Sequence, residues 1–270
     1  MLTVSECWLV ISLFINMFTP KTERIKKIVE NQLGIIEKLD SFLSDKVNVY
    51  IDYANVRPWS EKLQWHIEPR RLKQFLQSFD NICSIKFYQG ELLGDPRSHK
   101  EVKHLQSLEC KRFFLRTKPV KIMKFSVNMS GVDDQSPTLL RHFIRASLLR
   151  KFDIETIEFL NKKLREMNKK GIFEIQDRKC NFDVEIGSDM RVNHLTDGVD
   201  TFALWSGDSD FADPIKSLLE NGKKVILFAT AGRISRELND LIPLGLGVFD
   251  ISDIQDFICW LSEIGKKKTP

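Results

Sequence analysis

The sequence predicts an α/β fold in which helices cover both faces of a parallel sheet. Short runs of β-forming residues alternate along the chain with segments whose apolar residues recur at helical spacing. Such alternation requires crossover connections, which place parallel strands in one sheet. The composition agrees, because 42% hydrophobic and 29% charged residues are typical of a globular domain. It excludes disordered, collagen-like and polytopic membrane proteins.

The first 45 residues are expected to lie outside this alternation. The apolar stretch 2–18 contains Glu6 and lacks the basic start of a signal peptide. These features favour a packed leader over a helix that enters a membrane. From Thr22 to Leu43 the apolar residues recur at helical spacing, which predicts one amphipathic helix packed on the domain. Pairing of this helix with a second copy is the alternative, so a homodimer stays open.

The elements of the body follow in chain order. Runs of β-branched and aromatic residues predict strands at Val47–Tyr53, Ile82–Tyr88, Thr201–Trp205, Lys223–Ala229 and Gly247–Ile251. Helical spacing predicts helices at Pro69–Phe79, Ser98–Leu108, Phe211–Asn221 and Arg236–Leu241. Pro69 suits the first turn of a helix, and Gly222 suits the residue after a helix end. Arg112–Lys124 is expected to be extended and broken at Pro119, and Phe182–Ile186 leads through Asp189 into a helix.

One long basic segment interrupts the alternation. Between Thr138 and Lys170 the pattern is helical, with one apolar stripe, and Gly171 ends it. Its basic residues lie off the stripe and form either a solvated face or a surface that follows nucleic-acid phosphates. We therefore expect a helical insertion at about 138–170 within a domain that spans 46–258. A basic tail follows at 259–270.

Acidic residues follow two predicted strands and open a helix. Asp52 lies near the end of the first strand, and Asp208 and Asp210 come directly after Thr201–Trp205. Asp189 lies about where an acidic side chain opens a helix. Ligands of parallel sheets bind beyond the carboxyl ends of the strands, so these carboxylates are expected to converge there. A divalent cation offsets their repulsion, and oxygen ligands without Cys or His favour Mg²⁺ or Mn²⁺.

Each of these polar residues also has a structural interpretation. Asp210 suits a helix N-cap, with Asp213 as its capping-box partner. Asn55 could brace a turn, and Asp183 could be a surface carboxylate. Each explanation holds for a single residue, but the combination of acidic groups at two strand ends calls for a common cause.

Three motifs supply that cause, because they resemble the motifs of the NYN domain, the LabA-like branch of the PIN-like nucleases. The first is an apolar strand that ends in Asp-x-x-Asn, here Val49–Asn55. The second resembles Lys-Gly-Val-Asp-Val-x-Leu-x-x-Asp-Met and corresponds to Cys180–Met190, with Cys-Asn in place of Lys-Gly. The third, Ser-Gly-Asp-Ser-Asp-Phe, is present unchanged at Ser206–Phe211. The resemblance covers about residues 46–257.

The resemblance implies a Rossmann-like, PIN-like sheet and a hydrolase that cleaves RNA with the help of a metal ion. The catalytic residues that it implies are Asp52, Asn55, Asp189, Asp208 and Asp210, with Asp183 and Ser206 as further candidates. The four aspartates of the first group are expected to bind Mg²⁺ or Mn²⁺, with Asp210 as a direct or an indirect ligand. Asn55 and Ser206 are expected to orient water or the scissile phosphate.

Basic and aromatic residues follow the first motif. The combination suits phosphate contacts and base stacking on single-stranded or structured RNA, and the candidate residues are Arg57, Trp59, Lys62, Arg70 and Arg71. Trp59 and Trp65 could equally be anchors of the core. The net charge of +4 permits a nucleic-acid partner without requiring one.

Two alternatives to a nuclease remain open. A catalytically silent RNA-binding or scaffolding module could retain the fold. A metal-dependent phosphatase is the other, although Asp52-Tyr53-Ala54 lacks the Asp-x-Asp of haloacid-dehalogenase enzymes. The chain has neither a Walker loop nor a GxGxxG motif, so no nucleotide cofactor is expected. Five scattered cysteines without a CxxC pair fit reduced thiols in a cytoplasmic protein.

Overall fold

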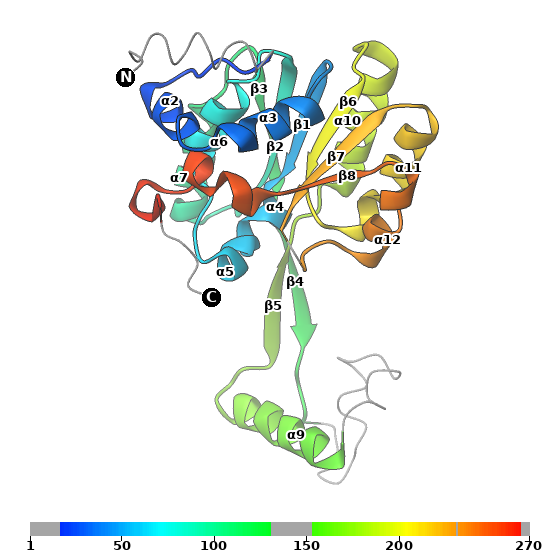
Figure 1. Cartoon of the computed structure of the whole chain (residues 1–270). Coiled ribbons are helices and arrows are strands. Elements are labelled where there is room, and N and C mark those ends of the chain that lie inside the picture. Colours follow the sequence, from blue (N-terminus) through cyan, green and yellow to red (C-terminus); the bar gives the residue numbers. More distant parts are fainter. Residues whose placement is uncertain (1–16, 131–152, 231, 266–270) are drawn as a thin grey trace. The chain divides into compact units, whose positions relative to one another are not determined.

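The computed structural model describes residues 17–130, 153–230 and 232–265 (Figure 1). The chain divides into two compact units. One unit combines the residues up to Pro119 with those from Cys180 onward, and the other is Val120–Lys179. The helix-forming pattern between residues 138 and 152 lies outside the described residues.

A six-stranded sheet forms the centre of the larger unit, in the order β3-β2-β1-β6-β7-β8. Its strands are β1 (Val47–Asp52), β2 (Ile82–Glu91), β3 (Phe113–Pro119), β6 (Thr201–Trp205), β7 (Lys224–Ala229) and β8 (Gly247–Asp250). All neighbouring pairs are parallel. The predicted α/β fold with a parallel sheet is therefore confirmed. β1 and β6 are buried along their whole length, which is why they read as continuous apolar runs.

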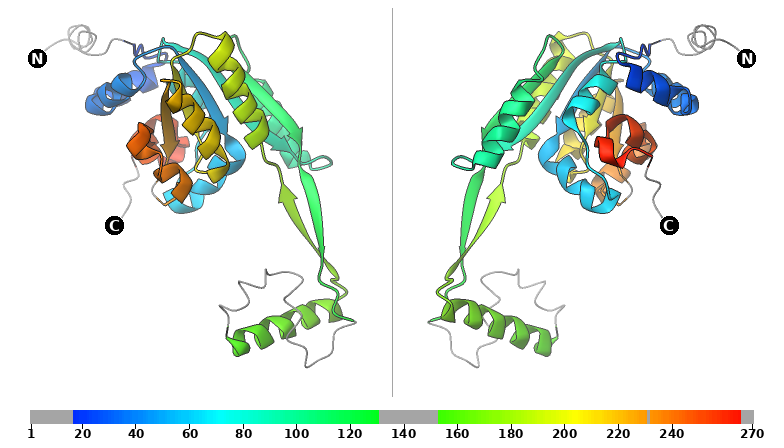
Figure 2. Two further views of the ribbon diagram at one scale, coloured as in Figure 1. Left: turned by 90° about the vertical axis from the view of Figure 1, so that its right-hand side faces the viewer. Right: turned by 90° about the vertical axis from the view of Figure 1, so that its left-hand side faces the viewer.

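Helices cover both faces of this sheet (Figure 2). The principal ones are α2 (Glu23–Val29), α3 (Leu33–Phe42), α6 (Pro69–Leu76), α7 (Pro96–Gln106), α10 (Asp183–Thr196), α11 (Ala212–Glu220), α12 (Arg236–Asn239) and α13 (Gln255–Ile258). On one face the Tyr50 hydroxyl donates to Asn193 Oδ1 of α10 over 2.8 Å. On the other face Phe249 of β8 contacts Phe42 of α3. Each face of the sheet is thus sealed by helices, as a buried parallel sheet requires.

Short helical turns complete the larger unit. They are α4 (Tyr53–Val56), η1 (Arg57–Trp59), α5 (Ser60–Leu63), η3 (Ser209–Phe211), η4 (Ile242–Leu244), η5 (Ile251–Ile254) and η6 (Leu261–Glu263). Two of them, α4 and η3, begin inside the first and third motifs, directly after Asp52 and Asp208. The sequence therefore turns sharply at both strand ends instead of extending the sheet.

The smaller unit is an antiparallel ribbon with one helix. β4 (Lys121–Ser126) pairs with β5 (Glu174–Lys179), and Lys121 lies opposite Lys179. α9 (Ile154–Lys169) joins the ribbon through Asn168, whose carbonyl Oδ1 accepts from the backbone N–H of Met129 over 2.7 Å. Gly171 ends the helical segment with a positive φ of 77°, a conformation that glycine adopts without strain.

Two expected elements differ from the structure, and one expected break is present. The segment from Thr22 to Leu43 is two helices, because α2 ends at Val29 and α3 begins at Leu33. The backbone tightens between them, where Gln32 N–H donates to Val29 O over 3.0 Å. The extended segment expected at Arg112–Lys124 is present with its break at Pro119, because β3 ends at Pro119 and β4 begins at Lys121 in a different sheet. The helix expected after Asp189 begins at Asp183, so the whole acidic motif from that residue onward is helical.

The expected tail also begins too early. Cys259 is buried and pairs with Ile67 in an isolated β-bridge. The described residues 259–265 therefore belong to the folded larger unit. Among the described helices, none is long and apolar enough to cross a membrane. The apolar stretch 2–16 lies outside the described residues.

Candidate active site

The acidic motifs lie where the direction of the sheet reverses. From β1 the chain builds β2 and β3 on one side, then returns to add β6, β7 and β8 on the other side. β1 and β6 are neighbours, with Ile51 in register with Trp205. Asp52 ends β1, and Ser206 directly follows β6. The carboxyl ends of two strands at such a reversal form the usual ligand crevice of an open α/β sheet.

Two hydrogen bonds hold the Asp52 carboxylate in place at the carboxyl end of β1. Its Oδ1 accepts from the backbone N–H of Asn55 over 3.4 Å, which caps α4. Its Oδ2 accepts from the Ser206 hydroxyl over 3.5 Å. The residue is only 6% exposed. Asn55 Oδ1 in turn accepts from the backbone N–H of Gly207 over 3.1 Å, so the first and third motifs are joined directly.

The third motif forms a compact turn around Asp208. Its Oδ1 caps η3 by accepting from the backbone N–H of Asp210 over 3.3 Å. The Ser206 hydroxyl accepts from the Asp208 backbone N–H over 3.3 Å. Asp208 is half-buried and Asp210 is exposed. The side chain that caps η3 is thus Asp208, two residues before the predicted cap Asp210.

Gly207 is required by a close approach of two loops. A Cβ at this position would lie 1.6 Å from the carbonyl oxygen of Arg233, closer than any real contact. The Ser235 backbone N–H donates to the Gly207 carbonyl over 3.0 Å and holds the loops in place. The glycine of Ser-Gly-Asp-Ser-Asp-Phe therefore serves backbone packing next to the acidic side chains.

Burial, together with the nearby charges of Asp208 and Asp183, raises the pKa of Asp52 to about 6 against the lowering effect of its hydrogen bonds. Asp183 lies at the N-terminal end of α10 and is half-buried. The structure therefore groups Asp52, Asp183 and Asp208 electrostatically. A buried carboxyl group with two acidic neighbours is a marker of functional sites.

Asp189 lies in a different environment from these three. Its Oδ2 accepts from the Tyr88 hydroxyl over 2.6 Å and lies 3.3 Å from Lys86 Nζ. Six residues along a helix correspond to a rotation of about 600°, so Asp183 and Asp189 do not share one side of α10. The charge of Asp189 is matched by Lys86, and its side chain fastens α10 to β2.

Sequence reasoning missed Lys86 and Tyr88. The signal that could have found them is the register of β1 with β2, in which Tyr88 lies beside Asp52 and Lys86 beside Tyr50. Alternate residues of neighbouring strands point to the same face. The side chains of β2 that reach α10 therefore follow from the position of Asp52.

The expected metal ligands are only partly gathered. Among the described residues, no group of three His, Cys, Asp or Glu side chains is arranged to hold a metal ion. The donor chemistry nevertheless fits a hard cation, because Asp52, Asp183 and Asp208 offer carboxylate oxygens alone. A cation there would also offset the burial and repulsion that raise the pKa of Asp52.

The expected RNA contacts divide between surface and core. Trp59 and Trp65 are each 2% exposed, so both indoles take the alternative role of core anchors. Arg57 is 59% exposed and forms an ion pair of 2.9 Å with Glu101. Lys62 is exposed as well. These two cations lie in the segment that follows Asp52, where a backbone phosphate could reach them.

The two arginines of α6 differ from each other. Arg70 is exposed, whereas Arg71 is half-buried. Burial, and then the charge of Arg71, lower the pKa of Arg24 to about 10. Arg71 therefore belongs to a partly buried basic group beneath α6, and Arg70 is the better placed of the pair for a phosphate.

Comparisons with known proteins place the chain in a family. The chain is similar to the low amplitude and bright protein LabA of Synechococcus elongatus, with 22% identity over 218 residues, 81% of this chain and 90% of that protein. A crystal structure of a protein of unknown function from Vibrio parahaemolyticus covers 80% of this chain and 96% of its own, with a TM-score of 0.46 and 17% identity. The family model of the NYN domain matches residues 46–242. That range contains all three acidic motifs and most of the sheet, and the chain therefore belongs to the NYN domain family, a nuclease-type family.

Proposed function

We propose that the protein is a ribonuclease that hydrolyses phosphodiester bonds of RNA with the help of Mg²⁺ or Mn²⁺. The observation that carries this proposal is the buried carboxyl group of Asp52 at the switch point of the sheet. Two further carboxyl groups raise its pKa, an arrangement that opposes folding and is typical of functional sites. Membership of a nuclease-type family supports the same activity.

The residues have distinct roles in this proposal. Asp52, Asp183 and Asp208 would hold the divalent cation through their carboxylate oxygens, and the cation would supply an acidified water molecule and charge stabilisation at the leaving oxygen. Asn55 and the Ser206 hydroxyl fix Asp52 and the turn that carries Asp208. The exposed Asp210 stands beside this group as a further acidic residue.

Asp189 acts as a positioning residue. Its contacts with Tyr88 and Lys86 anchor α10 on β2. The same helix carries Asp183 at its N-terminal end. Asp189 therefore fixes the place of Asp183 relative to the end of β1 and has no need to touch the cation.

Cleavage of labelled single-stranded and structured RNA in Mg²⁺, Mn²⁺ or EDTA tests the proposal. We expect metal-dependent cleavage by the wild type and none by Asp208→Asn. Asp200→Asn is the matched control, because Asp200 is an exposed carboxylate that pairs with Lys223. A fully active Asp208→Asn protein would refute the proposal.

Two further variants separate the ligand role from the positioning role. We expect Asp183→Asn to lose cleavage while its thermal stability is kept. We expect Asp189→Asn to lower thermal stability, because Lys86 then loses its charged partner and keeps only its hydrogen bond to Asn193. The reverse pattern would assign the cation to Asp189 and contradict the set of ligands proposed above.

A second function is favoured by one observation. The described residues hold no closed group of three metal-binding side chains. A catalytically silent RNA-binding module on the same fold agrees with that finding. RNA binding by a folded wild type that cleaves no substrate with either metal would select this second function.

A further inference from the structure

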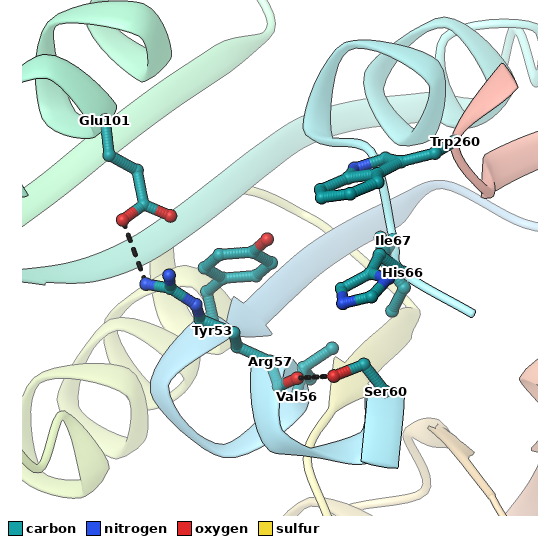
Figure 3. Close-up of a pocket in the computed structure, with 8 residues that line it drawn as sticks. All are labelled: Tyr53, Val56, Arg57, Ser60, His66, Ile67, Glu101 and Trp260. Carbon is teal, nitrogen blue, oxygen red and sulfur yellow. Dashed lines mark hydrogen bonds and ion pairs between the residues drawn. The ribbon is translucent and has the colours of Figure 1, made fainter. Parts of the chain in front are cut away.

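A cavity of about 270 Å³ lies beside the candidate active site and contains none of its acidic residues (Figure 3). Its walls come from segments far apart in the sequence. Tyr53, Arg57 and Ser60 follow the end of β1, His66 precedes α6, Glu101 belongs to α7, and Trp260 follows α13. The volume is slightly below the range of about 300–1,000 Å³ that is usual for drug-sized ligands. It suits one ring system better than a chain of several.

One side of the cavity is an aromatic platform. The His66 and Trp260 rings are stacked, with centroids 4.3 Å apart and planes inclined by 14°. The His66 side chain is 51% exposed and Trp260 is 46% exposed. Exposed aromatic rings of this kind offer a π-face on which a nucleobase can stack.

The platform is held rigidly before any ligand arrives. The Trp260 backbone N–H donates to the His66 carbonyl over 3.1 Å, and Ile67 pairs with Cys259 in the neighbouring bridge. The buried Glu263 accepts from the His66 backbone N–H over 2.8 Å, and its second oxygen lies 3.1 Å from His66 Nδ1. A fixed platform loses little conformational entropy on binding, which favours affinity.

The other side of the cavity is polar. Figure 3 shows Arg57 and Glu101 facing the platform across Tyr53, whose ring packs on Phe87 with centroids 4.7 Å apart. Arg57 Nη1 and Glu101 Oε2 form an ion pair of 2.9 Å. A carboxylate repels an anionic group, so the part of a ligand that enters must carry hydrogen-bond donors. A guanine edge presents two parallel N–H donors, from N1 and from the 2-amino group, which match the two oxygens of one carboxylate.

The cavity is joined to the acidic site through α4. The Asp52 carboxylate caps this short helix, and Tyr53 and Val56 of the same helix line the cavity. A nucleotide whose base enters the cavity therefore has its backbone on the segment that starts at Asp52. Trp260 lies beyond the residues 46–242 that match the family model, so this wall is supplied by the chain's own C-terminal segment.

We propose that the cavity is a nucleobase subsite for single-stranded RNA, in which a guanine stacks on the His66–Trp260 platform and donates its N–H groups to Glu101. The proposal rests on the ribonuclease function proposed above and assigns its preference at one nucleotide position. Arg57 stays beside Glu101 in their ion pair of 2.9 Å.

Binding of fluorescently labelled single-stranded RNA in EDTA tests this subsite without cleavage. The three probes are short oligouridines of the same length, and they differ only in the central nucleoside, which is guanosine, inosine or adenosine. We expect the guanosine probe to bind the wild type most tightly, since inosine lacks the 2-amino donor. We expect Trp260→Ala to weaken its binding by about tenfold, because base–aromatic stacking contributes free energy of that size.

Three variants keep the result interpretable. Trp260→Phe retains a ring and should keep most of the affinity if Trp260→Ala fails to fold. Glu101→Gln should remove the preference for guanosine over adenosine. Leu261→Ala is the matched control, because Leu261 is the exposed neighbour of Trp260 and does not line the cavity.

The outcomes separate the two proposals. Equal binding by the wild type and folded Trp260→Ala, or no preference for guanosine, overturns the subsite and leaves the ribonuclease in place. Absence of RNA binding by the wild type overturns the subsite as well, and together with absence of cleavage it also overturns the ribonuclease.

Discussion

Replacing Asp52 by asparagine should stabilise the fold at neutral pH while it abolishes RNA cleavage. Burial and two neighbouring carboxylates raise the pKa of Asp52 from 3.8 to about 6. The folded protein thus holds this proton more tightly than the unfolded chain does. Between pH 3.8 and pH 6 the free energy of unfolding therefore falls as pH rises. The loss is about 3 kcal/mol above pH 6, because one pKa unit corresponds to about 1.4 kcal/mol.

Asparagine removes the ionisable group and keeps the shape. Its Oδ1 can accept from the Asn55 backbone N–H, and its amide can donate to the Ser206 hydroxyl, which also accepts hydrogen bonds. We therefore expect Asp52→Asn to gain about 3 kcal/mol at pH 7.5 and about 1 kcal/mol at pH 4.5. At the higher pH the melting temperature should rise by about 5 °C.

Urea and thermal denaturation at the two pH values, both in EDTA, measure this gain. Asp200→Asn is the control and should change the free energy of unfolding by less than about 1 kcal/mol at either pH, because its ion pair is exposed. A loss of stability in Asp52→Asn at pH 7.5, or an equal gain at both pH values, would refute the reasoning. With Mg²⁺ in place of EDTA, the wild type should become more stable and the stability of Asp52→Asn should stay unchanged.

The remaining predictions concern the packing around the site. Gly207→Ala should lower the melting temperature and reduce cleavage at least tenfold, because its Cβ would meet the Arg233 carbonyl; normal activity would contradict the close approach. Tyr88→Phe removes the hydroxyl that donates to Asp189 and should cost about 1.5 kcal/mol in urea denaturation, whereas an unchanged midpoint would speak against that bond. Trp59→Ala should destabilise the fold by about 3–5 kcal/mol, because the indole is buried in the core. Trp59→Phe should bind RNA as tightly as the wild type in a fluorescence anisotropy titration, and weaker binding would indicate that the indole contacts RNA.

The sheet could be predicted from the sequence because its strands are buried on both faces. The sequences of β1 and β6 are largely apolar and are followed by turn-forming polar residues. The predicted ends of both strands therefore lie within two residues of the ends in the structure. β5 could not be found, because Glu174–Lys179 is exposed throughout and carries no apolar alternation. The break between α2 and α3 was hidden because the apolar spacing continues across Asn31 and Gln32.

The sequence predicts where the acidic site lies, but it predicts only some of the aspartates that form it. Asp52 and Asp208 follow directly from the ends of two neighbouring strands. The choice between Asp183 and Asp189 depends on where α10 begins and how it is rotated, and sequence spacing fixes neither. Trp260 gave no signal, because its partner His66 lies almost two hundred positions away and meets it only through tertiary backbone pairing.

The pairing of β4 with β5 brings the first and last residues of the smaller unit close together. Lys121 lies opposite Lys179 in the ribbon, so the two points at which the chain leaves and re-enters the larger unit are about 5 Å apart. A linker of a few residues could span that gap, and closing a short loop in place of the long excursion costs little entropy. A change in the length of the excursion between Lys121 and Lys179 therefore need not change the separation of its two ends.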